Sequence, residues 1–163
     1  MPERTSLHIS TIRGRVLWRL KSWLPAHASG EQSVTFAGHL LPTPVGTTTF
    51  APLHALCLGP AEWLVIQPGD ATSDVAADGL AIVDVSDGLV SLDVCGPRVR
   101  EILSAGCGLD LDPQCFSAGR CAHTCLAQIA VTIECLAQQH FQLYALRSYS
   151  HYLKDWLTDA AAG

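Results

Sequence analysis

The chain has 163 residues, of which 48% are hydrophobic and only 15% are charged. This length predicts one domain or one pair of closely packed subdomains, and the hydrophobic share excludes an intrinsically disordered protein. A net charge of −5 argues against a nucleic-acid-binding protein. The sequence contains neither the apolar run of a membrane span nor the apolar stretch of a signal peptide. We therefore expect a cytoplasmic protein.

The N-terminal half predicts short elements separated by turn-forming residues. Residues 16–21 alternate as in a half-buried strand, although a helical face through Ile12 and Trp23 is also compatible with them. Residues 34–41 have apolar side chains at helical spacing, which predicts a helix that stops before Pro42. Two further strands are expected on either side of a Gly-Pro turn, at 54–58 and 63–67.

The middle of the chain predicts a hairpin and a short helix. The strand-like runs 81–85 and 89–95 flank Ser-Asp-Gly, and Asp-Gly between apolar runs is a strong hairpin signal. Apolar residues at i, i+3 and i+4 from Val99 then indicate a helix of two to three turns, which follows a Gly-Pro break. Gly106 stands where the C-cap of that helix would fall.

The C-terminal part predicts three strands and a helix. The strands are expected near 120–126, 129–136 and 141–146. Ser148 is a suitable N-cap for the helix that follows, because its hydroxyl can accept an unpaired backbone N–H. The residues of one helical stripe are Tyr149, Tyr152, Leu153, Trp156 and Leu157. Strands with segregated helices predict an α+β two-layer domain.

Half of the ten basic residues lie in the first 21 positions, where Glu3 is the only acid. A basic segment attached to an acidic body is either a docking element or a solvated face. We favour the solvated face, because exposed charges contribute little by themselves.

No pattern in the sequence predicts a catalytic, cofactor-binding or metal site. On a strand the thiolates of Cys121 and Cys125 would lie about 13 Å apart, too far for one zinc ion. No spacing indicates a Cys–His nucleophile, a phosphate-binding glycine loop or a serine elbow. Asp110 and Asp112 are interpreted as turn formers. Seven cysteines are expected to stay reduced, mostly as small buried hydrophobes: Cys57, Cys95, Cys107, Cys115, Cys121, Cys125 and Cys135.

Four blocks in the sequence resemble a known family. Residues 58–64, Leu-Gly-Pro-Ala-Glu-Trp-Leu, resemble the Leu-Gly-Pro-x-Glu-Trp-Leu signature of the gamma subunit of heterotetrameric sarcosine oxidase. The other blocks follow in the family's order, up to about residue 157. They are Asp84 to Gly88 with Gly96-Pro97, Gly106-Cys107-x-Leu109-Asp110-Leu111-x-Pro113 with Phe116 to Ala127, and Arg147-Ser148-Tyr149 with Tyr152 to Leu157.

This resemblance implies a fold and a role. The gamma subunit resembles part of the folate-binding aminomethyltransferase fold, so we expect two-layer α/β sandwich subdomains with mainly antiparallel sheets, at about 1–80 and 81–163. The family's oxidase converts sarcosine to glycine, forms hydrogen peroxide and passes a one-carbon unit to tetrahydrofolate. FAD, FMN, NAD and tetrahydrofolate are expected in larger flavoprotein partner subunits. The resemblance thus implies a non-catalytic accessory subunit of an oxidoreductase complex.

A permanent subunit needs an interface that is apolar at its centre, and aromatic side chains dominate such contacts. Trp18, Trp23 and Phe50 are therefore the interface candidates. Two alternatives stay open. One is a stand-alone folate- or pterin-binding domain, in which Arg120 and Arg147 would meet a glutamate tail. The other is a scaffold for an unknown partner.

Overall fold

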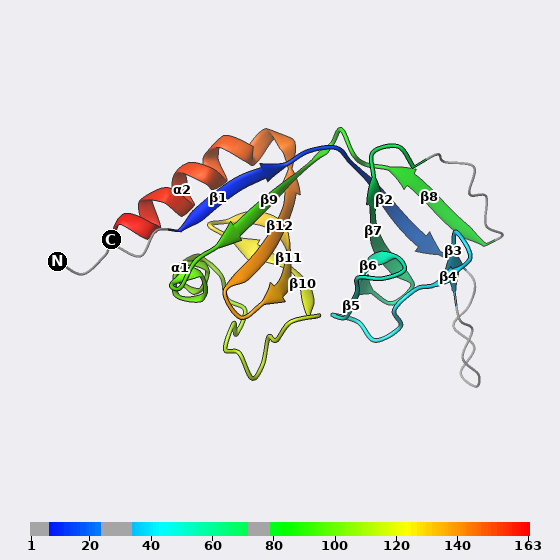
Figure 1. The fold of residues 1–163 in the computed structure, drawn as a ribbon, viewed down its shortest axis with the longest axis horizontal. Coiled ribbons are helices and arrows are strands. Elements are labelled where there is room, and N and C mark those ends of the chain that lie inside the picture. The colour runs from blue at the N-terminus through cyan, green and yellow to red at the C-terminus, as the bar shows by residue number, and fades with distance from the viewer. Residues whose placement is uncertain (1–6, 24–33, 72–78) are drawn as a thin grey trace. The chain divides into compact units, whose positions relative to one another are not determined.

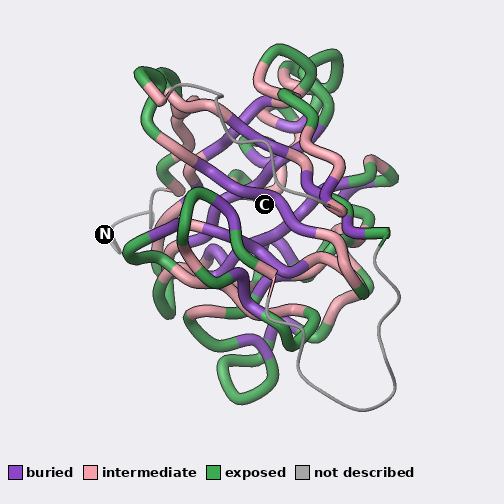
Figure 2. Tube along the Cα trace, turned by 90° about the vertical axis from the view of Figure 1, so that its right-hand side faces the viewer, coloured by how far each residue is buried: buried purple, intermediate pink, exposed green. Residues whose placement is uncertain are grey.

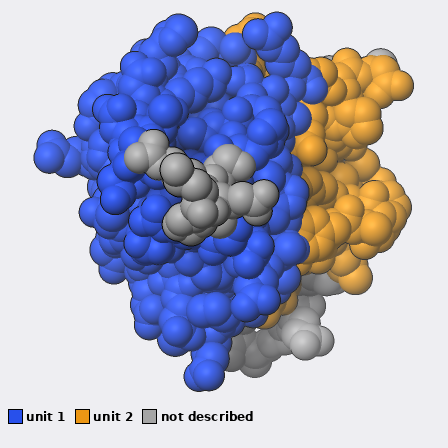
Figure 3. All heavy atoms as spheres, turned by 60° about the vertical axis from the view of Figure 1, so that its left-hand side comes forward, with its two compact units in different colours: residues 1–13, 88–163 blue, residues 14–87 orange. Residues whose placement is uncertain are grey.

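The structure is a computed structural model that describes residues 7–23, 34–71 and 79–163 (Figure 1). The chain divides into two compact units, which Figure 3 distinguishes by colour. Unit 1 contains the residues up to Arg13 and residues 88–163, and unit 2 contains residues 14–87. The expected boundary near residue 80 is therefore displaced to 87/88. The N-terminal residues belong with the C-terminal half, because the first strand pairs there.

Unit 1 is one antiparallel sheet with two helices. The sheet order is β1-β9-β12-β11-β10. Its elements are β1 (His8–Ile12), β9 (Leu89–Cys95), α1 (Val99–Gly106), β10 (Cys121–Leu126), β11 (Ile129–Ala137), β12 (His140–Leu146), the 3-10 turn η1 (Arg147–Tyr149) and α2 (Ser150–Ala162). The antiparallel pairing and the two helices confirm the predicted α+β class.

The core of unit 1 lies between the helices and one face of the sheet. Because successive strand residues point to opposite faces, Leu92, Ile133 and Leu143 all point to the same side, and each is fully buried. Leu103 from α1 and Leu157 from α2 complete the cluster. Figure 2 shows the buried segments in purple. The helical stripe predicted for α2 is confirmed in part, since Leu153 and Leu157 are buried whereas the two tyrosines are exposed.

Unit 2 is built on a second antiparallel sheet, with the order β5-β6-β7-β2-β8. Its strands are β2 (Arg15–Ser22), β3 (Thr35–Phe36), β4 (His39–Leu40), β5 (Thr48–Thr49), β6 (His54–Gly59), β7 (Glu62–Pro68) and β8 (Leu80–Asp84). One face packs on Phe36 and holds two tryptophans. The indole of Trp18 donates to Gln67 Oε1 at 2.8 Å, and that of Trp63 donates to the Pro42 carbonyl at 2.7 Å.

Most predicted strands are confirmed, including the strand alternative for 16–21. The helix predicted at 34–41 is wrong. Residues 35–40 form the hairpin β3–β4, and its turn residues Ala37 and Gly38 have φ values of 50° and 78°. Two consecutive positive φ values are required by a tight hairpin turn and are incompatible with a right-handed helix. No helix in the described part of the chain is long and apolar enough to span a membrane.

The hairpin predicted across Asp87-Gly88 is also wrong, although both of its strands exist. β8 pairs with β2 in unit 2, whereas β9 pairs with β1 and β12 in unit 1. The side chain of Ser86 holds the segment after β8 in unit 2. Its Oγ donates a hydrogen bond to Asp84 Oδ1 and accepts one from the Leu17 amide at 2.9 Å. The bonds from the Ser86 hydroxyl and amide lower the pKa of the Asp84 carboxyl. The Leu17 bond holds the residues after β8 against β2.

Two predicted helix caps differ from the structure. Gly106 is the last residue of α1, and its backbone does not adopt the left-handed conformation of a glycine C-cap. Ser148 lies inside η1, and α2 begins at Ser150 after Tyr149, which makes no side-chain cap bond. The tight turn before α2 takes the place of a serine cap.

Gly106 instead allows the Trp156 ring and the backbone of Ala127 to pack closely against the end of α1. A Cβ atom at this position would lie 2.5 Å from the Trp156 ring and 3.2 Å from the Ala127 nitrogen. The Gly106 carbonyl accepts the Ala127 amide at 2.9 Å, and the Tyr152 hydroxyl donates to the Ala127 carbonyl at 3.1 Å. The β10–β11 turn is thus held between the end of α1 and the start of α2.

Arg100 of α1 fixes the long segment between α1 and β10. Its guanidinium donates to the carbonyls of Gln138, at 2.8 Å, Phe116, at 3.0 Å, and Leu111. The guanidinium carbon also lies 4.8 Å from the centre of the Phe141 ring. A single planar fork of donors therefore joins a helix, the loop 107–119 and the β11–β12 turn.

Replacing Arg100 with Ala should lower the free energy of unfolding by roughly 2–4 kcal/mol, because three carbonyls lose their donor. Urea denaturation of the purified chain measures this change. The matched control is Arg98→Ala on the same helix, whose exposed ion pair with Glu101 should contribute little. Equal shifts of the two midpoints would contradict the role assigned to Arg100.

Gly106→Ala should destabilise unit 1 by roughly 1–3 kcal/mol, since the added methyl group overlaps the Trp156 ring. Gly108→Ala is the control, because a Cβ atom there has no neighbour within 4 Å. Thermal unfolding monitored by circular dichroism should separate the two variants, and the idea fails if Gly106→Ala unfolds at the wild-type temperature.

Candidate functional site

The face of the unit 1 sheet opposite the helices carries two rows of mostly polar side chains. The register aligns Asp93, Gln142 and Glu134 across β9, β12 and β11. The neighbouring row contains Ser91, Tyr144 and Thr132 on the same three strands. Buried polar residues of the described chain are Ser22, Ser91, Thr132, Glu134 and Gln142, so four of the five belong to these rows. We call this set the polar rows.

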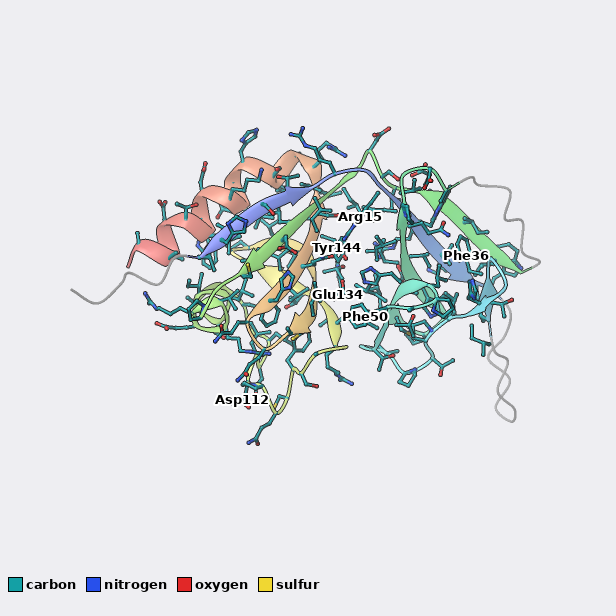
Figure 4. All side chains as sticks on the ribbon, in the orientation of Figure 1. Arg15, Phe36, Phe50, Asp112, Glu134 and Tyr144 are labelled. Carbon is teal, nitrogen blue, oxygen red and sulfur yellow. The ribbon has the colours of Figure 1, made fainter. Side chains whose placement is uncertain are left out.

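Glu134 and Tyr144 form the centre of the polar rows. Glu134 is fully buried, and the Tyr144 hydroxyl donates to its Oε2 at 2.8 Å. The same hydroxyl lies 2.9 Å from Gln142 Oε1. Both side chains are labelled in Figure 4. A buried carboxyl is costly unless hydrogen-bond donors reach it, so the Tyr144 contact stabilises this face.

The rows continue toward the edges of the sheet. His140 Nε2 lies 2.7 Å from Asp93 Oδ1, and the Gln142 amide donates to the same oxygen at 3.3 Å. On the other side, His123 Nδ1 lies 3.2 Å from Thr132 Oγ1. The polar groups therefore engage one another along the sheet, which is the arrangement of a structural network.

The sequence analysis missed the polar rows. Their signal is the alternation of β11 and β12, in which Thr132 and Glu134 interleave with valine and isoleucine, and Gln142 and Tyr144 with phenylalanine and leucine. Alternation predicts a strand with one polar face. It does not distinguish a polar face in solvent from a buried one.

Three cysteines have thiol pKa values raised above the ordinary value. Burial raises the pKa of the Cys57 and Cys135 thiols, and a hydrogen bond with Asp110 raises that of the exposed Cys115. A nucleophilic cysteine needs the opposite shift, because the thiolate is the reactive form. Within the described residues, no group of three or more His, Cys, Asp or Glu is placed to hold a metal ion.

An open cleft of about 570 Å³ lies between α1 and residues 107–113. Asp110 and Asp112, which line this cleft, are turn formers as predicted. The Asp110 carboxyl accepts the Asp112 amide at 3.0 Å, and the Asp112 carboxyl accepts the Gln114 amide at 2.8 Å. The first of these bonds lowers the pKa of Asp110. The carboxyls therefore shape the loop.

The three aromatic interface candidates have different environments. Trp18 is buried in the core of unit 2. Trp23 is 66% exposed, and Phe50 is 47% exposed beside the His54 ring. The other large exposed hydrophobic residues in the described chain are Leu40, Val45, Val83, Leu146, Tyr149 and Tyr152.

Comparison with known proteins shows the family. The model of the sarcosine oxidase, gamma subunit family matches residues 25–163. The chain belongs to this family. The resemblance found in the four sequence blocks is thereby confirmed, and the family match also includes residues N-terminal to those blocks.

Two relatives illustrate the range of similarity within the gamma subunit family. The sarcosine oxidase subunit gamma of an Arthrobacter species is 27% identical over 145 residues, which are 84% of this chain and 71% of that protein. That of Corynebacterium sp. (strain P-1) is 30% identical over 113 residues, 64% of this chain. The match covers 55% of that second protein, so the chain spans only about half of its length.

Solved structures confirm the predicted fold. A chain of the heterotetrameric sarcosine oxidase from Corynebacterium sp. U-96, in complex with pyrrole 2-carboxylate, matches with a TM-score of 0.81 at 21% identity, over 96% of this chain and 84% of that chain. Glycine cleavage system aminomethyltransferase T from Bartonella henselae matches with a TM-score of 0.59 at 14% identity, over 93% of this chain and 45% of that chain. The aminomethyltransferase-like architecture expected from the sequence is therefore correct.

Tyr144→Phe tests the centre of the polar rows. Removing the hydroxyl deprives the buried Glu134 carboxyl of a donor, which should cost roughly 1–3 kcal/mol of unfolding free energy. Tyr149→Phe is the control, since that side chain is exposed. The double variant Tyr144→Phe, Glu134→Leu should recover part of the loss, because the carboxyl is then absent too. A chemical denaturation series measures all three, and a neutral Tyr144→Phe would contradict the role of the contact.

Proposed function

We propose that this chain is a non-catalytic accessory subunit of a heterotetrameric sarcosine oxidase-like flavoenzyme. In this proposal the complex converts sarcosine to glycine, passes the one-carbon unit to tetrahydrofolate and forms hydrogen peroxide. The observation that carries the proposal is the match to the gamma subunit family over residues 25–163. The fold shared with a chain of a heterotetrameric sarcosine oxidase supports it.

The chemistry of the described residues is consistent with a structural role. The buried acid Glu134 is bound by Tyr144, and the Asp110 and Asp112 carboxyls are bound by backbone amides. The pKa values of the Cys57, Cys115 and Cys135 thiols are raised, which disfavours the reactive thiolate. The proposal assigns FAD, FMN, NAD and tetrahydrofolate to the larger partner subunits and the complex to the cytoplasm.

Exposed aromatic side chains of unit 2 are the proposed contacts with those subunits. Trp23 and Phe50 each expose close to half of their surface or more. Aromatic side chains are enriched at the centres of protein interfaces, which makes these two exposed rings the candidates. Trp18 is not part of this proposal, because it is buried in the core.

Co-expression with the larger flavoprotein subunits from the same source tests the proposed function. An affinity tag on this chain should co-purify those subunits in fixed stoichiometry, together with the absorbance band of bound flavin. Sarcosine-dependent hydrogen peroxide production should follow the complex and be absent from the isolated chain. A colourless eluate that contains this chain alone would contradict the proposal.

Titration of tetrahydrofolate into the isolated chain tests the alternative of a stand-alone folate-binding domain. We expect a flat calorimetric trace, because the buried carboxyl that could face a pterin is already bound by Tyr144. A saturable heat signal would favour the folate-binding alternative over the accessory subunit.

A further inference from the structure

Strand β8 is an open edge of the unit 2 sheet. It is the last strand in the order β5-β6-β7-β2-β8 and, within the described residues, pairs with β2 alone. Figure 1 shows it in green beside β2. An unpaired edge presents a row of backbone donors and acceptors to any extended segment that approaches it.

The register shows which backbone groups are free to pair. Val85 donates to the Leu17 carbonyl at 2.9 Å, and the Gly79 carbonyl accepts the Trp23 amide at 3.3 Å. In an antiparallel pair every second residue bonds the same neighbour. The odd-numbered residues of β8 therefore face β2, and the N–H and C=O groups of Leu80, Ile82 and Asp84 point outward from the sheet.

One face beside this edge carries exposed apolar side chains among charged ones. Val83 is 54% exposed and lies opposite Arg19 in the register, while Ala81 lies opposite Lys21. Continuing the alternation of β2 by one step places Trp23, the most exposed large hydrophobic residue of the described chain, on this same face. Val83, Ala81 and Trp23 form a strip that we call the β8 strip.

The charges on this face determine which partner it fits. Arg19 is bound to Glu62 through its Nε and Nη2 atoms, with an Nε–Oε1 distance of 2.8 Å. Lys21 lies opposite both Ala81 and Glu62 in the register, yet it forms no ion pair with a described residue. The β8 strip therefore borders one ammonium group, that of Lys21, whose partner in the register, Glu62, is already bound by a guanidinium.

We propose that the β8 edge binds an extended segment of a partner subunit by adding a strand to the unit 2 sheet. The segment has apolar side chains at alternating positions over the β8 strip and a carboxylate that reaches Lys21. Backbone bonds to residues 80, 82 and 84 supply affinity, and the apolar and acidic side chains supply specificity. This inference rests on the proposed function, which supplies the partner.

The other sheet edges are less suited to this role. β1 consists of His8–Ile12 and contains no large exposed hydrophobic residue, and β10 is partly capped by the bridge between Cys107 and Leu126. β5 has only two residues, Thr48 and Thr49. The combination of an open edge, an exposed apolar strip and an unpaired cation occurs at β8.

Charge-sensitive variants of the co-expressed complex test the proposal. Val83→Glu should weaken co-purification with the larger subunits by roughly tenfold or more, whereas Val83→Lys should weaken it less, because the partner is acidic there. The matched control is Leu146→Glu in unit 1, since Leu146 is 53% exposed and therefore equally accessible. All three chains should unfold at the wild-type temperature, because each position is on the surface.

Hydrogen exchange provides the direct readout of strand addition. Peptides from residues 79–85 should exchange more slowly in the complex than in the isolated chain, whereas peptides from β1 should not change. Ile82→Pro removes an outward N–H without removing a bond to β2, so it should abolish this protection and weaken assembly.

The outcomes separate the inference from the proposed function. If the wild-type chain does not assemble with the larger subunits, the proposed function fails. If the wild-type chain assembles and Val83→Glu assembles equally well with no protection of 79–85, the β8 proposal fails alone. If the isolated chain dimerises and the dimer shows the protection, the occupant is a second copy of this chain and the assignment to a partner subunit is overturned.

Discussion

The position of one guanidinium determines how unit 1 is assembled. Arg100 projects from α1 and satisfies carbonyls in the loop 107–119 and in the β11–β12 turn. Phe116 from that loop then stacks on Phe141 of β12, with ring centres 6.5 Å apart and an angle of 6° between the rings. A lysine at position 100 would reach one of these carbonyls but could not match the fixed fork of donors. Because the loop carries no helix or strand of its own, this contact stabilises its path, and the backbone bonds of Gly119 and Arg120 to Cys135 lead it into β10.

The two faces of the unit 1 sheet perform different tasks. The helix-covered face contains leucine, isoleucine and valine side chains and supplies the hydrophobic stabilisation of the unit. The opposite face carries the polar rows, in which Glu134, Tyr144 and Gln142 satisfy one another. Such networks add less net stability than an apolar core, yet they impose one arrangement on the strands that contribute to them. A subunit that must present a fixed surface to a larger complex benefits from that rigidity.

Local sequence patterns predicted elements well and predicted the connections between them poorly. The strands β10, β11 and β12 follow from alternation, and α1 follows from its apolar spacing after Gly96-Pro97. Asp87-Gly88 failed as a hairpin signal because Ser86 bonds to β2, and no local pattern reveals that partner. Gly106 failed as a C-cap because its constraint is the ring of Trp156, fifty positions further along the chain. The burial of the polar rows and of Trp18 was unpredictable for the same reason, since burial depends on distant segments. The four family blocks predicted the fold correctly, because residues that match a known family in the same order imply that family's fold.

The chain order of the two units has a consequence for biosynthesis. Unit 2 is an insertion within unit 1, because residues 14–87 interrupt the connection between β1 and β9. During translation the sheet of unit 2 is complete before β9 has been made, and β1 must wait for its neighbour until the ribosome has passed the whole insertion. The inserted unit can fold early, and the sheet of the enclosing unit can close only after β9, β10, β11 and β12 have been made. The strand β1 is therefore made before the other described strands, but it pairs with β9 only after the whole of unit 2 has been made.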